Sequence, residues 1–527
     1  MSIIIALIVF LAAFCSYSIY KTGDNIIEEF INYDDTNEYV KYSNQRFAIS
    51  DIKSLNPLVS DDVDTYYMSK VFFSSLFKEN SKLTLEKDLV NKYSVDSENG
   101  TVSISLIDDA ICGDGSHITG NDVSFTVDQI KNYGKKSPFY TMAKKISYVQ
   151  VQGTYSIKIV FSDASDAALN NLTFPIVSRN SYSDDKDYVP NGSGQYVVKT
   201  YKKASYIKAV PNEDYYGEVA TNSLYFQMLR NGTDLYNFLN TFDITAMVYK
   251  DFNGKSIAED KNLTYNSIPS NCLEYIGFNF NNEILQDKYF RKALANTVNT
   301  NDIINKAYSN IGIPVDSIYF PEYLESENTG DMYPYDFSNA VSILDKIRAV
   351  DSDDDGYREY KNGEKIELNI LVNENNPDRI LAANELVSNF DSVQIKAKVN
   401  ALPWEEYKQA IKNSNFDIVI GGFKIDKADN LESLFDKGNI LNYENDQILA
   451  LAKSLKTTMN IKDYKETYEN LKELLKADLP YYPICYKTYS FFQTQYASSE
   501  IVPSYFDVYS GVSTWRYKKI VPKDEED

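Results

Sequence analysis

An acidic turn in the second half of the chain has the residue spacing of a calcium-binding loop. The run DSDDDG at residues 351–356 places carboxylates at its first, third and fifth positions and a glycine at its sixth. Carboxylates at this spacing supply the first ligands of an EF-hand loop, whose twelfth residue is a bidentate glutamate. Here the twelfth residue is Asn362. Two interpretations stay open: a weak calcium site at Asp351, Asp353 and Asp355, or an acidic turn that binds no metal.

Histidine and cysteine chemistry is restricted by the composition. The chain has one histidine, His117, which argues against a multi-histidine metal site or a Ser-His-Asp triad with a second base. Its four cysteines show no C-x-x-C spacing, and one pair could form in an oxidising compartment without the sequence assigning it. The phosphate-binding loop of ATPases is also missing. We therefore expect a protein that is not an enzyme and that needs no cofactor.

The bulk composition is that of a large globular protein. With 527 residues, the chain is too long for one hydrophobic core, so two or three domains are expected. Its net charge of -22 argues against nucleic acid as a partner, because phosphate binding needs a basic surface. The 44 tyrosines are suited to lining a cleft, since each ring has an apolar body and a polar tip.

The N-terminal segment stands apart from the rest of the chain. Residues 2–20 carry no charge and would form an apolar helix about 29 Å long, enough to cross a bilayer core. The segment lacks the basic residues with which a cleaved signal peptide begins. A lipoprotein signal ending at Cys15 would have Phe14 where a small residue is needed. We expect export with retention at the membrane and favour an uncleaved anchor, followed by a polar linker over residues 21–45.

Strand and helix patterns alternate after this linker. Period-two or continuous apolar runs predict strands over residues 47–49, 102–107, 155–161, 196–198, 206–210, 367–372, 393–399 and 416–420. Helical spacing predicts helices over residues 66–77 and 404–411. A third helix should follow Asp287, with Phe290, Leu294 and Val298 facing inward, and a fourth should run through Leu381, Leu386 and Phe390. This alternation indicates layers of the α/β class.

The run GDGSHITGNDVSFT at residues 113–126 predicts a tight turn that leads into a helix. Asp-Gly supplies the turn, Thr119 is a good N-cap, and Asp122 three residues later approximates a capping box. The apolar residues that follow mix helical and strand spacing, so their period alone leaves the segment ambiguous.

The same run resembles the SDGxPLTAxDVxFT signature of family 5 extracellular solute-binding proteins, the peptide and nickel binders of ABC importers. Further blocks resemble the family in its order: LNP at 55–57, VFFSSL at 71–76, DLVNKY at 88–93, PNGSGQY at 190–196, NEDYYG at 212–217, YIGFN at 275–279, DKYFRKAL at 287–294 and DLPYYP at 478–483. The chain departs from the family at Tyr93 and Cys112, which replace tryptophans, and at Gln195, which replaces a proline. The resemblance spans residues 46–515.

The resemblance implies a type II periplasmic-binding-protein fold, an α/β architecture of two lobes with an extra subdomain and a ligand cleft between the lobes. It implies the first segment of lobe I at residues 46–65, the extra subdomain at 66–185, the rest of lobe I at 186–274, lobe II at 275–488 and the return to lobe I at 489–520. An acidic tail follows at residues 521–527.

The resemblance also implies a ligand site. The run GFKID at residues 422–426 resembles the GWxxDY element of peptide binders, in which the aspartate meets the peptide's α-ammonium group. Asp426 would form that charge-assisted bond, beside Gly422 and Phe423, although Phe423 replaces the family's tryptophan. Ser193 and Gly194 would present backbone groups to the ligand or act only as a turn.

The function implied by the resemblance is capture of peptides outside the cytoplasm and their delivery to the permease subunits of an ABC importer, by a monomer tethered through its N-terminal segment. The alternatives are a binding protein for a metal complex or another small solute, and a peptide receptor in signalling. A surface hydrolase or an interaction protein is a further alternative, disfavoured by the missing catalytic constellation.

Overall fold

The structure is a computed structural model of the chain. It describes residues 31–32, 39–42, 44–80, 83–164, 168–185, 187–230, 237–238, 244–250, 257, 264–361, 363–424, 431–455, 461–493, 503–515 and 517–518. The expected N-terminal anchor, most of the linker, the acidic tail and Asp426 lie outside these residues. Within them, no helix has the length and apolar character needed to cross a bilayer.

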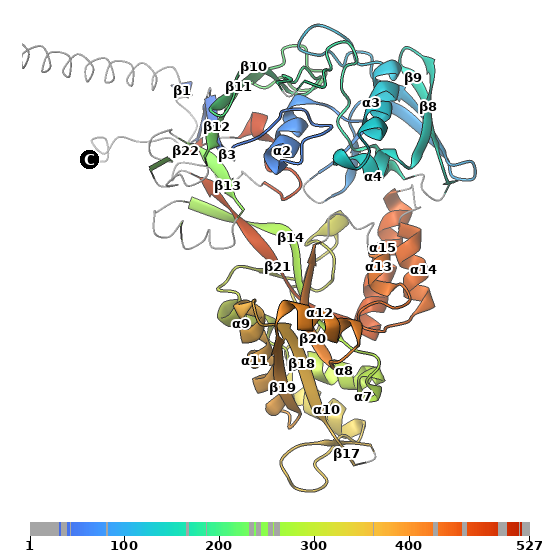
Figure 1. Ribbon diagram of the computed structural model, residues 1–527, viewed down its shortest axis with the longest axis vertical. Coiled ribbons are helices and arrows are strands. Elements are labelled where there is room, and N and C mark those ends of the chain that lie inside the picture. The colour runs from blue at the N-terminus through green and yellow to red at the C-terminus, as the bar shows by residue number, and fades with distance from the viewer. Residues whose placement is uncertain are drawn as a thin grey trace, which may run out of the picture.

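A ribbon of two long strands joins two lobes of the molecule (Figure 1). Strand β14 (Thr264–Phe278) pairs antiparallel with β21 (Tyr481–Gln493), from Thr264 opposite Gln493 to Gly277 opposite Tyr481. We call the two parts the upper lobe, whose core holds buried residues between Phe47 and Ile268 and between Phe491 and Trp515, and the lower lobe, whose cores draw mainly on residues between Leu273 and Tyr486. The domain boundaries given above stay predictions.

One sheet runs through both lobes. Its order is β10 (Tyr196–Lys202), β11 (Tyr206–Pro211), β12 (Ser223–Leu229), β3 (Asn44–Ser50), β13 (Ala246–Tyr249), β21, β14, β20 (Ile418–Lys424), β18 (Glu367–Asn373) and β19 (Lys396–Leu402), and β15 (Ile313–Pro314) pairs with β21. The strands predicted at 47–49, 196–198, 206–210 and 367–372 are confirmed, and those predicted at 393–399 and 416–420 begin and end a few residues later.

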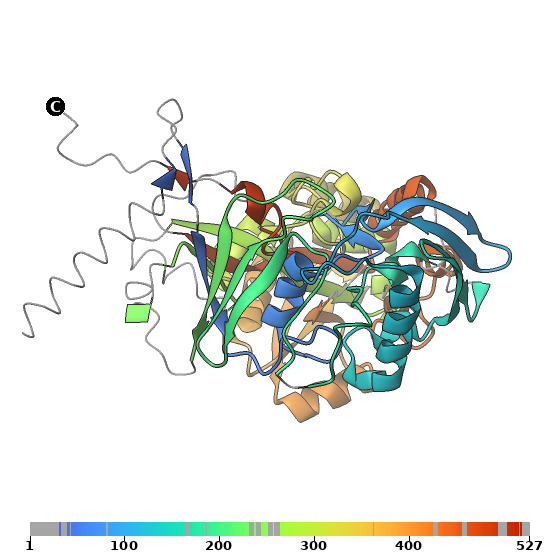
Figure 2. The same cartoon turned by 90° about the horizontal axis from the view of Figure 1, so that it is seen from above.

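A smaller sheet covers the far end of the upper lobe. Its order is β6 (Val90–Asp96), β7 (Thr101–Leu106), β9 (Ser156–Phe161) and β8 (Ile146–Gly153), and helix α3 (Gly120–Tyr133) packs on β8. Figure 2 shows this sheet and α3 opposite the end that carries β1 (Ile31–Asn32), β2 (Tyr39–Tyr42) and β22 (Tyr517–Lys518). Because β2 pairs with both β1 and β22, the first and last described strands lie together.

The ambiguous segment after Thr119 is a helix. The Asp122 carboxylate accepts a hydrogen bond from the Thr119 backbone N–H at 2.8 Å, as a capping box requires. Val123, Val127 and Ile130 are buried on one face of α3. The capping residues therefore decide the structure where the apolar period does not.

The helix predicted over residues 66–77 is wrong in its extent. Helix α2 (Val63–Phe72) ends where Phe73 turns to extended backbone, and Phe77 begins strand β4 (Phe77–Glu79). The Asp88 carboxylate accepts the Ser75 N–H at 2.8 Å, and the Ser75 carbonyl accepts the Leu89 N–H at 2.9 Å. These contacts with the bend between β5 (Leu85–Lys87) and β6 (Val90–Asp96) hold the segment extended, although its apolar spacing continues the helix.

The lower lobe has helices on both faces of its parallel strands β18, β19 and β20. Side chains of α8 (Lys288–Ala295), α9 (Thr300–Ala307), α10 (Phe337–Lys346) and α11 (Pro377–Asp391) share one core with alternate residues of β18 and β20, whereas α12 (Trp404–Lys412), α14 (Asp446–Leu455) and α15 (Ile461–Asp478) share the other. The helix predicted through Leu381, Leu386 and Phe390 is α11, in which Leu386 and Phe390 are buried and Leu381 is 49% exposed. Val298 is buried as predicted, although α8 ends before it.

Arg291 of α8 ties the lower lobe to the start of β21. It is 1% exposed, and its guanidinium donates to the carbonyls of Leu285 at 2.6 Å, Gln286 at 3.0 Å and Leu479 at 3.2 Å, and to that of Asp478. Because Leu479 precedes β21, these bonds fix where the ribbon leaves the lower lobe.

The remaining elements are short. They are β5 (Leu85–Lys87), α4 (Tyr140–Ala143), α7 (Glu283–Gln286), β16 (Glu359–Tyr360), β17 (Glu364–Lys365), α13 (Glu432–Phe435) and single 3-10 turns at Gly134–Lys136, Leu169–Leu172, Tyr323–Glu325 and Val512–Thr514.

Candidate ligand-binding site

The carboxyl ends of the parallel strands in the lower lobe share one edge of the sheet. In the pairing of β20 with β14, Ile418 lies opposite Phe278 and Lys424 opposite Cys272, so β20 runs toward the half of β14 that enters the upper lobe. Loops at the carboxyl ends of parallel strands are the usual place for a ligand in α/β folds. The predicted residues Gly422 and Phe423 lie at this edge, and Asp426 is outside the described residues.

A buried ion pair lies directly beside β20. Arg379, in the first turn of α11, donates to both carboxylate oxygens of Glu274 on β14, with Nε at 2.8 Å and Nη2 at 3.0 Å. Glu274 is 4% exposed and also accepts a hydrogen bond from the Tyr308 hydroxyl at 3.2 Å. Burial disfavours the charged form of Arg379, but the bond and charge of Glu274 outweigh it and raise the arginine's pKa.

Gly422 makes room for this pair. A Cβ atom at Gly422 would lie 2.3 Å from Nη2 of Arg379 and 2.8 Å from Oε1 of Glu274, both far too close. The absence of a side chain therefore lets the ion pair rest against the backbone of β20. Contact between Gly422 and a ligand stays a prediction.

Aromatic rings form the surroundings of Phe423. Its half-buried ring lies 4.9 Å from that of Tyr275 and 6.3 Å from that of Tyr481, between centroids. Burial raises the pKa of Tyr275 well above its usual value, so its hydroxyl stays neutral. Phe423 thus continues an aromatic layer toward the edge where the ligand is predicted.

Ser193 and Gly194 lie in the upper lobe, against the end of α2. The Gly194 N–H donates to the Phe72 carbonyl at 3.1 Å, and the Ser74 hydroxyl donates to the Ser193 carbonyl at 3.0 Å. A Cβ atom at Gly194 would lie 2.5 Å from the Phe72 carbonyl carbon. These contacts hold the loop on the helix, and ligand contacts of Ser193 and Gly194 stay predictions.

Sequence reasoning missed three residues at the site. Trp404 begins α12 just after the end of β19, is 48% exposed and stacks on Tyr407 at 5.5 Å. An exposed tryptophan after a strand end is a signal that could have found it. Glu274 and Arg379 are 105 positions apart and carry no local signal.

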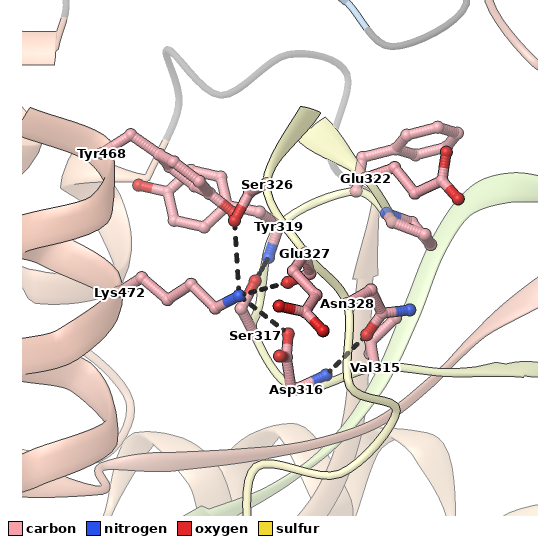
Figure 3. A pocket seen from close by; sticks show the side chains of 12 residues that line it. Val315, Asp316, Ser317, Tyr319, Glu322, Ser326, Glu327, Asn328, Tyr468 and Lys472 are labelled. Carbon is pink, nitrogen blue, oxygen red and sulfur yellow. Dashed lines mark hydrogen bonds and ion pairs between the residues drawn. The ribbon is translucent and has the colours of Figure 1, made fainter. Parts of the chain in front are cut away.

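A loop of the lower lobe contacts the upper lobe. The Phe320 ring lies 5.2 Å from that of Phe506, which follows β21 in the upper lobe. Figure 3 shows how Lys472 of α15 holds this loop, with its ammonium 3.2 Å from the Asp316 carboxylate and 2.7 Å from the Glu327 carbonyl. Positive φ angles at Glu322, Leu324 and Glu325 bend the segment that follows Phe320. The contacts of Lys472 therefore fix the loop that carries Phe320, whose ring packs on Phe506 of the upper lobe.

The acidic turn gathers four carboxylates. Oxygens of Asp351, Asp353, Asp355 and Glu359 lie within 4.8 Å of one another. The Lys365 ammonium lies 3.0 Å from Asp353 and 2.6 Å from Asp355, so the protein itself supplies a cation there. Calcium binding stays a prediction, and Glu359 was missed because it is the ninth residue of the loop rather than the twelfth.

Comparison with known proteins gives consistent matches. Residues 84–439 match the family described as bacterial extracellular solute-binding proteins, family 5 Middle. The oligopeptide-binding protein AppA of Bacillus subtilis is 24% identical over 474 residues, covering 82% of this chain and 84% of the relative. Di/tripeptide-binding protein 1 of Pseudomonas aeruginosa is 23% identical over 403 residues, covering 70% and 73% of the two chains.

Solved structures share the fold at low sequence identity. The unliganded open form of the periplasmic murein tripeptide binding protein MppA has a TM-score of 0.74 at 17% identity, with 93% of this chain and 98% of that one covered. An ABC transporter substrate-binding protein from Sinorhizobium meliloti has a TM-score of 0.73 at 16% identity, with 88% and 98% covered.

Proposed function

Because the chain belongs to family 5 of the bacterial extracellular solute-binding proteins, we propose that it captures peptides between its two lobes and delivers them to an ABC importer. The expected α/β fold of a type II periplasmic-binding protein is confirmed by the family match and by the solved structures. The relatives named above are described as peptide-binding proteins, which favours a peptide over a metal complex.

The open edge of β20 is the observation that carries the proposal. β20 pairs with β14 along its full length, from Ile418 to Lys424, whereas within the described residues its other edge pairs with β18 only at Ile418 and Val419. The main chain from Gly421 to Lys424 can therefore accept an extended peptide as an added strand. Backbone pairing of this kind binds peptides of many sequences, since it does not depend on their side chains.

The charged end of the peptide is assigned to Asp426 in this proposal. Asp426 lies two positions beyond the last residue of β20, where its carboxylate could meet the α-ammonium group of a peptide laid along that strand. The exposed ring of Trp404 and the half-buried ring of Phe423 then offer apolar surface to the ligand's side chains.

Calorimetry with a peptide library, free and N-acetylated, tests this function. Acetylation and Asp426→Asn should each remove one charge-assisted bond and cost about 1.5–3 kcal/mol, roughly 10- to 150-fold in Kd. Asp109→Asn, on an exposed acid of the upper lobe, is the matched control. Equal affinity for acetylated peptides, or no effect of Asp426→Asn, would remove Asp426 from the site, and a library without any binder would remove the peptide.

We also propose that the protein works outside the cytoplasm as a monomer, tethered by residues 1–20 and docking on permease subunits. The name of the family, extracellular, supports the location. Fractionation of cells that produce the full chain or a chain without residues 2–20 tests the tether, because only the full chain should remain with the membranes.

A further inference from the structure

Two cations near the open edge of β20 are already neutralised by the protein. Arg379 is bound through two nitrogens to Glu274, and Lys487 of β21 lies 3.1 Å from Asp378, the neighbour of Arg379 in α11. The two pairs join both strands of the ribbon to the same turn of one helix. The positive charge that each cation could present to a ligand is therefore largely neutralised by its own carboxylate partner.

Separating Arg379 from Glu274 requires a large free energy. Nε and Nη2 of Arg379 donate to Glu274, and Nη1 lies 3.3 Å from the Asn373 side-chain oxygen, so each nitrogen of the guanidinium has an acceptor within the protein. Glu274 is nearly fully buried, and without Arg379 it would keep only the bond from Tyr308 among those described. A buried carboxylate that loses its cation is strongly destabilised. A ligand carboxylate would thus have to displace Glu274 at a large cost.

We infer that Glu274 determines ligand specificity by withholding Arg379 from the carboxyl terminus of a bound peptide. This inference rests on the proposed function and narrows its substrate class. Recognition depends on the amino end and on the backbone, and the carboxyl end of the ligand is not read by Arg379. The site therefore takes peptides with an amidated or extended carboxyl end as readily as short free acids.

Calorimetry with matched peptides, one a free acid and the other its C-terminal amide, tests the inference. The full-length protein should bind both with Kd values within about twofold. In Glu274→Gln the guanidinium loses its ionic partner, so the free acid should become favoured by more than tenfold. The double variant Glu274→Gln with Arg379→Met should lose that preference, and Lys135→Gln, on an exposed lysine of the upper lobe, should behave as wild type.

Two results would overturn the inference. The first is a tenfold or larger loss on amidation in the wild-type protein, a measurement that does not depend on whether any variant folds. The second is a folded Glu274→Gln variant, checked by thermal unfolding, that gains no preference for the free acid. Failure of the proposed function has a different signature, because then neither peptide binds, whatever its carboxyl end.

Discussion

Removing the guanidinium of Arg291 should destabilise the lower lobe strongly. Two of its hydrogen bonds, to the carbonyls of Leu285 and Leu479, are fully buried, and Arg291→Met fills similar volume without replacing them. Each buried acceptor left without a donor costs about 1–3 kcal/mol, so the free energy of unfolding should fall by about 2–6 kcal/mol. The Asp478 carboxylate, 3.7 Å away, would also lose its cation.

Urea denaturation followed by circular dichroism measures this change. Lys288→Met, on an exposed lysine of the same helix, is the matched control and should stay within about 0.5 kcal/mol of wild type. Arg291→Lys keeps the charge but cannot reach all of these carbonyls, so its free energy of unfolding should lie between those of Arg291→Met and Lys288→Met. If Arg291→Met is as stable as Lys288→Met, the hydrogen bonds from the guanidinium to the four carbonyls do not stabilise the fold, and the reasoning is refuted.

Three other perturbations test separate parts of the structure. Gly422→Ala should push Arg379 off the strand and cost about 1–3 kcal/mol. Gly153→Ala, whose Cβ would lie at an ordinary van der Waals distance of 3.8 Å from the Ser156 Cβ, should be nearly neutral in thermal unfolding. A double-mutant cycle with Phe320→Ala and Phe506→Ala should give a coupling energy of about 0.5–1.5 kcal/mol, and no coupling would mean that the rings do not hold the lobes together. Burial raises the pKa of the Cys112 thiol to about 12, above its usual value near 9. The stability that its neutral form gives the fold is therefore full below about pH 9 and is lost as the pH rises toward 12. Labelling of Cys112 at pH 8, located by peptide mapping, should fail on the folded protein and succeed in denaturant, whereas the partly buried Cys272 is the internal reference.

Local patterns were sufficient for the elements that have an unambiguous period or cap. The apolar run of β18 reflects burial on both faces of a parallel sheet, and the start of α3 is encoded by Thr119 and Asp122. The end of α2 could not be predicted in the same way. It depends on Asp88, which lies in the bend between β5 and β6, and such tertiary contacts override the helical spacing of residues 73–77.

The candidate site was predicted only in part, for a similar reason. Gly422 and Phe423 belong to a contiguous run that a family resemblance can locate. The partners that surround them, Glu274 on β14 and Arg379 at the start of α11, are brought together only by folding. Glu274 and Arg379 also carry opposite charges, so the sequence shows no cluster of like charges that would indicate the site.

The ribbon of β14 and β21 makes the lower lobe an insertion with adjacent ends. Gly277 and Tyr481 face each other across the antiparallel ladder, so the chain enters and leaves this lobe at neighbouring points, about 5 Å apart. Such a segment can be excised or circularly permuted without stretching the backbone. Residues 273–486, whose ends pair as Leu273 opposite Tyr486 and which hold most of the two lower-lobe cores, should therefore fold as an autonomous unit. Their exchange between relatives offers a direct route to chimaeras with altered ligand range.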